Sequence, residues 1–194
     1  ASTFVENEAE CSALYTAIPD PNFEQALIEL GIDTNPTIDG QVLTANIEGV
    51  TNLDVSSKNI ADLTGIEGFT ALTELICEAN QLTSLDLSNN LALSYLGCGN
   101  NLLTSLDVSN NTALIELYCD GNQLTSLDVS NNTALTLLYC DNNQLTSLDV
   151  SANTALTQLY CRDNILTSLD VSNNIALVNL SCGTNQLTSL DVSA

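Results

Sequence analysis

A fixed internal repeat is the feature that most constrains the fold of this 194-residue chain. The string LTSLD recurs with a step of 21 residues, and its aspartates are Asp86, Asp107, Asp128, Asp149, Asp170 and Asp191. Six cysteines keep the same step, namely Cys77, Cys98, Cys119, Cys140, Cys161 and Cys182. A constant period of about 20 to 30 residues is typical of a solenoid, in which each unit packs against its neighbours.

Each 21-residue unit consists of two similar halves. The unit that begins at Leu72 reads LxxLxCxxN and then LxxLDLxxN. Neighbouring side chains of an extended segment point to opposite sides, so Leu75 and Cys77 are expected to point inward, as are Leu85 and Leu87. Stacking of such coils predicts two narrow parallel sheets of short strands, placed back to back.

This pattern resembles the signature of leucine-rich repeats. The nested 21-residue form, with Cys in one half and Leu-Asp in the other, resembles a class of bacterial leucine-rich-repeat proteins, and the resemblance covers about Val50 to Val192. It implies an α/β-type leucine-rich-repeat solenoid that is mostly strand and coil.

Two columns of asparagines follow the two halves. We expect their inward amides to bond backbone groups that are freed where the chain leaves each strand. The first column is Asn80, Asn101, Asn122, Asn143, Asn164 and Asn185, and the second is Asn90, Asn111, Asn132, Asn153 and Asn174.

A different pattern precedes the repeats. Asp20 is suited to cap a helix that continues through Pro21 and stops at Gly31. One face of this helix would cover the open end of the first coil, through Phe23, Ala26, Leu27 and Leu30. A strand-like segment, 42–47, follows.

The first repeat then has a step of 22 residues, from Val50 to Leu72. This order of helix and repeat resembles the N-terminal cap of internalin-type proteins, and also secreted leucine-rich-repeat proteins of marine Bacteroidetes. The resemblance implies export and surface display.

The expected organisation is a flexible lead-in (1–16), a cap with one helix (17–49) and a solenoid (50–194) that is truncated at its C-terminus. Because the chain lacks an initial Met and ends inside a repeat, we interpret it as a mature or excised piece. An uncapped last coil would permit end-to-end self-association.

The acidic balance of the chain excludes several partners. Lys58 and Arg162 are the only basic residues beside 24 acidic ones, and the formal net charge is −22. Nucleic acids and anionic membranes bind through clusters of Lys and Arg, so neither is expected as a partner. No apolar run approaches the ~20 residues that a spanning helix needs, so membrane insertion is not expected either.

Enzymatic chemistry is not expected. His is absent, which removes the usual general base and the commonest metal ligand. The repeat cysteines lack the clustered spacing of a zinc site, and we predict an inward ladder of reduced thiols that act as small hydrophobic groups. Side chains in register are poorly placed for disulfide geometry. Cys11 has no evident partner.

The outward columns of the Leu-Asp half are almost uniform. Serines flank the aspartate column formed by Asp86, Asp107, Asp128, Asp149, Asp170 and Asp191. Neighbouring carboxylates about 4.8 Å apart repel one another, so the column is either solvated or binds Ca²⁺ weakly. Apart from this ion no cofactor is expected. A regular hydroxyl-bearing face is also found in ice-binding solenoids, although those faces favour Thr and avoid charge.

The outward columns of the Cys half vary, and they bring aromatic side chains together. The candidate binding residues are Tyr95, Tyr118, Leu137, Tyr139, Tyr160, Asp120, Asp141 and Arg162. Exposed Tyr is a preferred contact residue, and the resemblance implies recognition on this strand face. The alternative is that the rings stack only on one another and stabilise the sheet.

The sequence therefore predicts a non-enzymatic module that binds a protein or a carbohydrate, in a secreted or cell-surface bacterial protein. A structural spacer or adhesin stalk, stabilised by Ca²⁺ on the aspartate column, is the alternative. One variable face beside one uniform face favours the binding module, because a spacer has no need of an irregular face.

Overall fold

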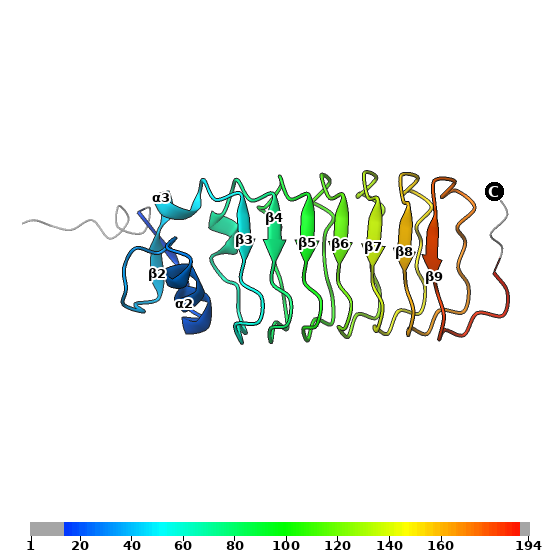
Figure 1. Ribbon diagram of the computed structural model, residues 1–194, viewed down its shortest axis with the longest axis horizontal. Helices are drawn as coiled ribbons and strands as arrows, with labels where there is room; N and C mark the ends of the chain where they lie inside the picture. The colour runs from blue at the N-terminus through cyan, green and yellow to red at the C-terminus, as the bar shows by residue number, and fades with distance from the viewer. Residues whose placement is uncertain (1–13, 191–194) are drawn as a thin grey trace, which may run out of the picture.

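A parallel sheet runs the length of the solenoid in the computed structural model, which describes residues 14–190 (Figure 1). Its strand order is β3-β4-β5-β6-β7-β8-β9, one strand for each coil. The strands are β3 (Asn52–Asp54), β4 (Glu74–Ile76), β5 (Tyr95–Gly97), β6 (Glu116–Tyr118), β7 (Leu137–Tyr139), β8 (Gln158–Tyr160) and β9 (Asn179–Ser181). Each pairs in register with the next, so equivalent residues of the repeats form straight columns.

The Leu-Asp half does not form the second sheet that the sequence predicted. Its described residues lie in turns and irregular structure, apart from an isolated bridge residue at Asp170. Each turn is closed locally, as where Asp107 Oδ1 accepts a hydrogen bond from Ser109 N at 2.9 Å. This bond occupies a backbone N–H that a second sheet would need, so the expectation of two sheets was wrong. The inward alternation of this half is nevertheless confirmed, since Leu87 and Val108 are buried.

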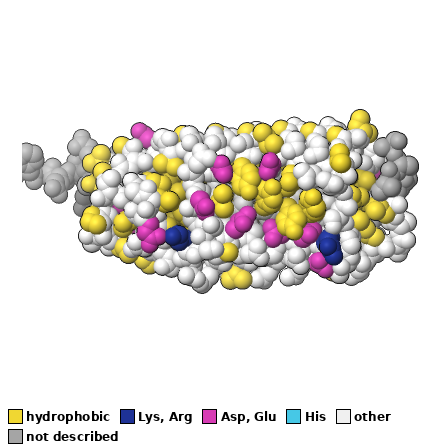
Figure 2. Space-filling view, viewed as in Figure 1, with side chains coloured by type: hydrophobic (Ala, Val, Ile, Leu, Met, Phe, Trp, Pro, Cys, Tyr) yellow, Lys and Arg dark blue, Asp and Glu magenta, His cyan; other side chains and the backbone are white. Residues whose placement is uncertain are grey.

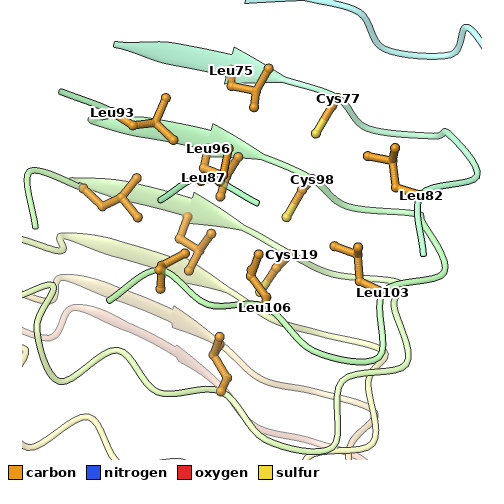
Figure 3. Packing of buried hydrophobic residues seen from close by; sticks show 14 of the residues in the cluster. Leu75, Cys77, Leu82, Leu87, Leu93, Leu96, Cys98, Leu103, Leu106 and Cys119 are labelled. Carbon is orange, nitrogen blue, oxygen red and sulfur yellow. The ribbon is translucent and has the colours of Figure 1, made fainter. Parts of the chain in front are cut away.

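The interior is a set of aliphatic and cysteine columns. Figure 3 shows Cys77, Cys98 and Cys119 following one another from coil to coil, with Leu75 and Leu96 beside them on the sheet. These cysteines, together with Cys140 and Cys161, are fully buried free thiols, whereas Cys182 is half-buried. The predicted cysteine ladder is confirmed.

Both asparagine columns bridge successive coils. In the first column, Asn122 Nδ2 donates to the carbonyl oxygen of Cys98 at 3.1 Å, and Asn122 Oδ1 accepts from Leu103 N at 3.0 Å. In the second column, Asn132 Nδ2 donates to the carbonyl oxygens of Val108 and Asn111. The expected structural role of both columns is confirmed.

The N-terminal cap contains two antiparallel strands, β1 (Tyr15–Ala17) and β2 (Gln41–Leu43), and two helices, α2 (Pro21–Glu29) and α3 (Thr44–Ile47). Thus β1 begins before the expected cap boundary at residue 17, and residues 44–47 of the strand-like segment 42–47 are helical. Residues 1–13, which include Cys11, lie outside the described residues, as do residues 191–194.

Helix α2 begins as predicted and joins the cap to the first coil. Asp20 Oδ1 accepts from the backbone N–H groups of the first turn, and Asp20 Oδ2 accepts from Ala61 N and Asp62 N. Phe23 is fully buried and lies 6.3 Å, between ring centroids, from Phe69, which follows the 3-10 turn η1 (Ile66–Gly68). Leu30 was expected on the covering face but is 50% exposed, because the helix ends before it.

Among residues 14–190, no helix has the length and apolar character needed to cross a membrane.

Candidate functional site

Four tyrosines form a continuous row of rings across the middle of the sheet, here named the tyrosine strip. It consists of Tyr95 on β5, Tyr118 on β6, Tyr139 on β7 and Tyr160 on β8. Successive ring centroids lie 5.3, 6.1 and 5.1 Å apart, and the planes are tilted by 35 to 58°. These are favourable aromatic pair geometries. All four side chains stay partly exposed, and Figure 2 shows hydrophobic side chains gathered over the centre of this face.

Two of the tyrosine hydroxyls bond to side chains two residues away on the same face of the sheet. Tyr118 Oη donates to Glu116 Oε2 at 3.1 Å, and Tyr160 Oη donates to Gln158 Oε1 at 3.1 Å. Tyr139 has an apolar residue at the equivalent place, and burial and the nearby charge of Asp141 raise the pKa of its hydroxyl. Burial and the bond to Glu116 raise the pKa of Tyr118 to about 12, so its hydroxyl keeps its proton at neutral pH.

Carboxylates border the strip where two glycines leave room for them. A Cβ atom at Gly97 would lie 2.7 Å from Glu78 Oε1, and a Cβ atom at Gly99 would lie 2.6 Å from Asp120 Oδ1. Both carboxylates therefore lie over the β5 coil, one from each neighbouring coil. Burial raises the pKa of Glu78 and of Asp120, and the charge of Asp120 adds to the rise at Glu78.

The other predicted site residues differ in how much of each side chain is exposed to a ligand. Leu137 is only 9% exposed and contributes to packing rather than to the surface. Asp141 is 6% exposed, and its Oδ1 accepts a hydrogen bond from Arg162 N at 2.6 Å. The side chain of Arg162 is exposed.

Sequence reasoning did not assign Glu78 and Glu116 to the site. Glu116 holds the Tyr118 hydroxyl, and Glu78 fills the space above Gly97. The signal for Glu78 was present in the sequence, because two glycines interrupt the outward columns beside it.

The aspartate column lies on the opposite, Leu-Asp side. Each carboxylate of the column from Asp86 to Asp149 accepts a hydrogen bond from the backbone N–H of the serine two residues later, as Asp86, Asp107, Asp128 and Asp149 all do. Hydrogen bonds from these serines lower the pKa of all four carboxyls. Asp170 makes the same bond to Ser172 N, and Asp191 lies outside the described residues.

The space between the coils of this side is hollowed but holds no ready-made metal centre. One hollow of about 350 Å³ is lined by Ser126, Asp128, Ser147 and Asp149 among others. Within residues 14–190, no three His, Cys, Asp or Glu side chains are grouped closely enough to hold a metal ion.

The thiols of the cysteine ladder are not placed for nucleophilic chemistry. Burial raises the pKa of Cys77 and of Cys161 to about 12, and it also raises the pKa of the three thiols between them well above the usual value. The reactive form of cysteine is the thiolate, so these groups act as packing residues at neutral pH.

Comparison with known proteins places this architecture among bacterial repeat proteins. No family model matches the chain. Internalin J of Listeria monocytogenes serotype 4b (strain F2365) is 46% identical over 73 residues, which are 37% of this chain and 8% of that protein.

Solved structures agree with this match over a longer part of the chain. The functional domain of InlJ from Listeria monocytogenes, described as including a cysteine ladder, has a TM-score of 0.77 and 39% identity over 92% of this chain and 45% of that one. The leucine-rich-repeat protein LIC12759 of Leptospira interrogans has a TM-score of 0.70 and 28% identity over 73% of this chain and 39% of that one.

The chain thus spans less than half the length of each of these relatives. With its repeat, its capped solenoid and its column of buried thiols, it is an internalin-like leucine-rich-repeat protein with a cysteine ladder.

Proposed function

We propose that the chain is a non-enzymatic, protein-binding module of a secreted or cell-surface bacterial protein, and that it binds through the sheet face bearing the tyrosine strip. The observation that carries this proposal is the contrast between the two sides of the solenoid. The Leu-Asp side repeats one Ser-Asp-Ser pattern, whereas the sheet face changes from strand to strand and presents four tyrosines.

The tyrosine strip has the properties of a contact surface. Partly exposed tyrosines combine a large apolar area with a polar hydroxyl, and they lose little conformational entropy on binding. Stacking and two hydroxyl bonds already order the rings, so the surface is preorganised. We propose export as well, because the cap and the repeats are internalin-like.

The binding surface can be tested by comparing two variants on arrays of extracellular protein domains and of glycans. Tyr139→Ala removes one of the two inner rings of the strip, and Thr146→Ala is the control on the Leu-Asp side. We expect the chain to retain a set of protein spots that Tyr139→Ala loses and Thr146→Ala keeps, with little change in Tm.

The same arrays separate the alternatives. Retention on glycans alone, again lost with Tyr139→Ala, would replace the protein partner by a carbohydrate. If Tyr139→Ala lowers Tm and changes no spot, the rings serve the sheet only and the spacer interpretation replaces the binding module.

A further inference from the structure

The sheet face carries far more negative than positive charge. The carboxylates on and beside its strands are Asp54, Glu74, Glu78, Glu116, Asp120 and the largely buried Asp141, and Arg162 is the one basic residue among them. The other base of the chain, Lys58, is paired with Glu29 of the cap, with Nζ and Oε2 2.7 Å apart. Within residues 14–190 this is the only ion pair, and Arg162, whose charge acts on Asp141, is the one cation beside the carboxylates of the sheet face.

Two of these carboxylates are held beside aromatic rings and away from full solvation. Glu78 and Asp120 lie over the β5 coil in the space left by Gly97 and Gly99, and burial raises the pKa of both. Tyr95 is on the same strand as Gly97. A guanidinium or ammonium group placed here would meet a carboxylate on one side and the face of a ring on the other.

We infer that the partner of this face is a polypeptide segment that carries Arg or Lys side chains, which would lie along the tyrosine strip. The inference rests on the proposed binding function and specifies its partner. Charge complementarity supports it, and so does the apolar surface between the acids, since Arg and Lys place their aliphatic stems on apolar surface and their charged ends on acids. The planar guanidinium also stacks on aromatic rings.

A single metal ion fits this face less well than a row of basic side chains. The carboxylates are spread over the coils of β3 to β7 and tyrosines lie among them. No group of three potential ligands is formed in the part of the chain that the structure describes. A partner with several cations spaced along an extended segment matches that distribution.

The inference can be tested by calorimetric titration with a blocked synthetic dodecapeptide, (Arg-Gly-Tyr-Gly)₃, and with the same peptide containing citrulline in place of arginine. Citrulline keeps the shape of arginine and removes its charge. We expect the arginine peptide to bind at low salt. Its affinity should fall about tenfold or more when the NaCl concentration is raised to screen charges. The citrulline peptide should not bind measurably.

A matched pair of triple variants locates the contact. Glu78→Gln, Asp120→Asn and Asp141→Asn remove three charges from the sheet face, while Asp107→Asn, Asp128→Asn and Asp149→Asn remove three from the Leu-Asp side. All six substitutions keep a hydrogen-bond acceptor, and equal melting curves would verify the fold. The first triple variant should lower the affinity for the arginine peptide about fivefold or more, and the second should lower it less than about twofold.

The outcomes separate this inference from the function on which it rests. Equal losses in both triple variants, or equal binding of the citrulline peptide, would overturn the basic partner. If array ligands depend on Tyr139 but not on Glu78, Asp120 and Asp141, the partner is not basic and the binding function stands. If no ligand depends on Tyr139, the binding function itself fails.

Discussion

Gly65 lies at a close approach between the cap and the first repeat. Its φ is +104°, and a Cβ atom there would lie 2.3 Å from Ile18 Cδ1 and 2.5 Å from the carbonyl oxygen of Ala17. Gly65→Ala should therefore lower the free energy of unfolding by about 2 to 4 kcal/mol, through strain and overpacking. Urea unfolding measures this. Gly49→Ala is the control, because nothing lies within 4 Å of its Cβ position, and a similar loss there would refute the contact as the cause.

The buried thiols make the free energy of unfolding decrease with pH in the alkaline range. Burial raises the pKa of Cys77 and Cys161 from 9.0 to about 12. A group with a raised folded pKa contributes stability that is complete below its unfolded pKa and is lost as pH rises through the folded one. The urea concentration at the midpoint of unfolding should therefore decrease as the pH is raised from about 9 to about 12. The fall should be shallower in Cys77→Val/Cys161→Val, and an unchanged slope would show that these two thiols do not contribute to it.

At the scale of single residues, sequence spacing predicted which side chains form buried columns. It predicted little about where the helix ends or which space a side chain fills. A cysteine every 21 residues on the inward side of a strand pattern is enough to predict a buried column. The exposure of Leu30 was not predictable in the same way, because the helix ends at Glu29. The space above Gly97, which Glu78 fills, depends on side-chain rotamers that sequence spacing does not determine.

The two asparagine ladders differ as structural elements. Asn122 uses both ends of its amide, since its Oδ1 accepts from Leu103 N and its Nδ2 donates to carbonyl oxygens. Asn132 donates in the same way, but its Oδ1 is buried and has no hydrogen-bond partner among the described residues. The first ladder therefore holds donors and acceptors, and the second holds acceptors only.

Replacing each asparagine by leucine tests this difference. Asn122→Leu leaves the buried N–H of Leu103 without an acceptor, whereas Asn132→Leu removes an oxygen that had no partner. We expect Asn122→Leu to be more destabilising by about 1 to 3 kcal/mol, measured by urea unfolding of both variants. Equal losses would mean that the two ladders contribute alike.

At this scale the sequence predicted the coils but not the second sheet. Alternation of inward residues in LxLx is compatible with a strand and with an extended irregular segment, and it does not distinguish them. The outcome depends on whether the aspartate side chain or the next coil takes the backbone N–H, as Asp107 and Ser109 illustrate. A rule that reads Asp-Val-Ser as a local turn would have predicted a single sheet.

For the whole molecule, the constant repeat length was enough to predict that tyrosines of successive coils lie in one row. Because every repeat from β4 onward has the same length, the sequence predicted which tyrosines become neighbours, and Tyr118, Tyr139 and Tyr160 pair in register as expected. It left open whether the rings stack or bind. The structure brings the rings into contact and leaves them partly exposed, so stacking and binding are compatible.

A net charge of −22 predicts that salt stabilises the whole molecule. Screening weakens repulsion among the acids on both sides of the solenoid, so Tm should rise with NaCl. The carboxylates of the aspartate column already accept bonds from their own turns, and no three ligands are grouped within residues 14–190. CaCl₂ and NaCl at equal ionic strength should therefore raise Tm equally. A larger rise with CaCl₂, reversed by a chelator and absent in Asp107→Asn/Asp128→Asn/Asp149→Asn, would instead assign the ion to that column and favour the spacer.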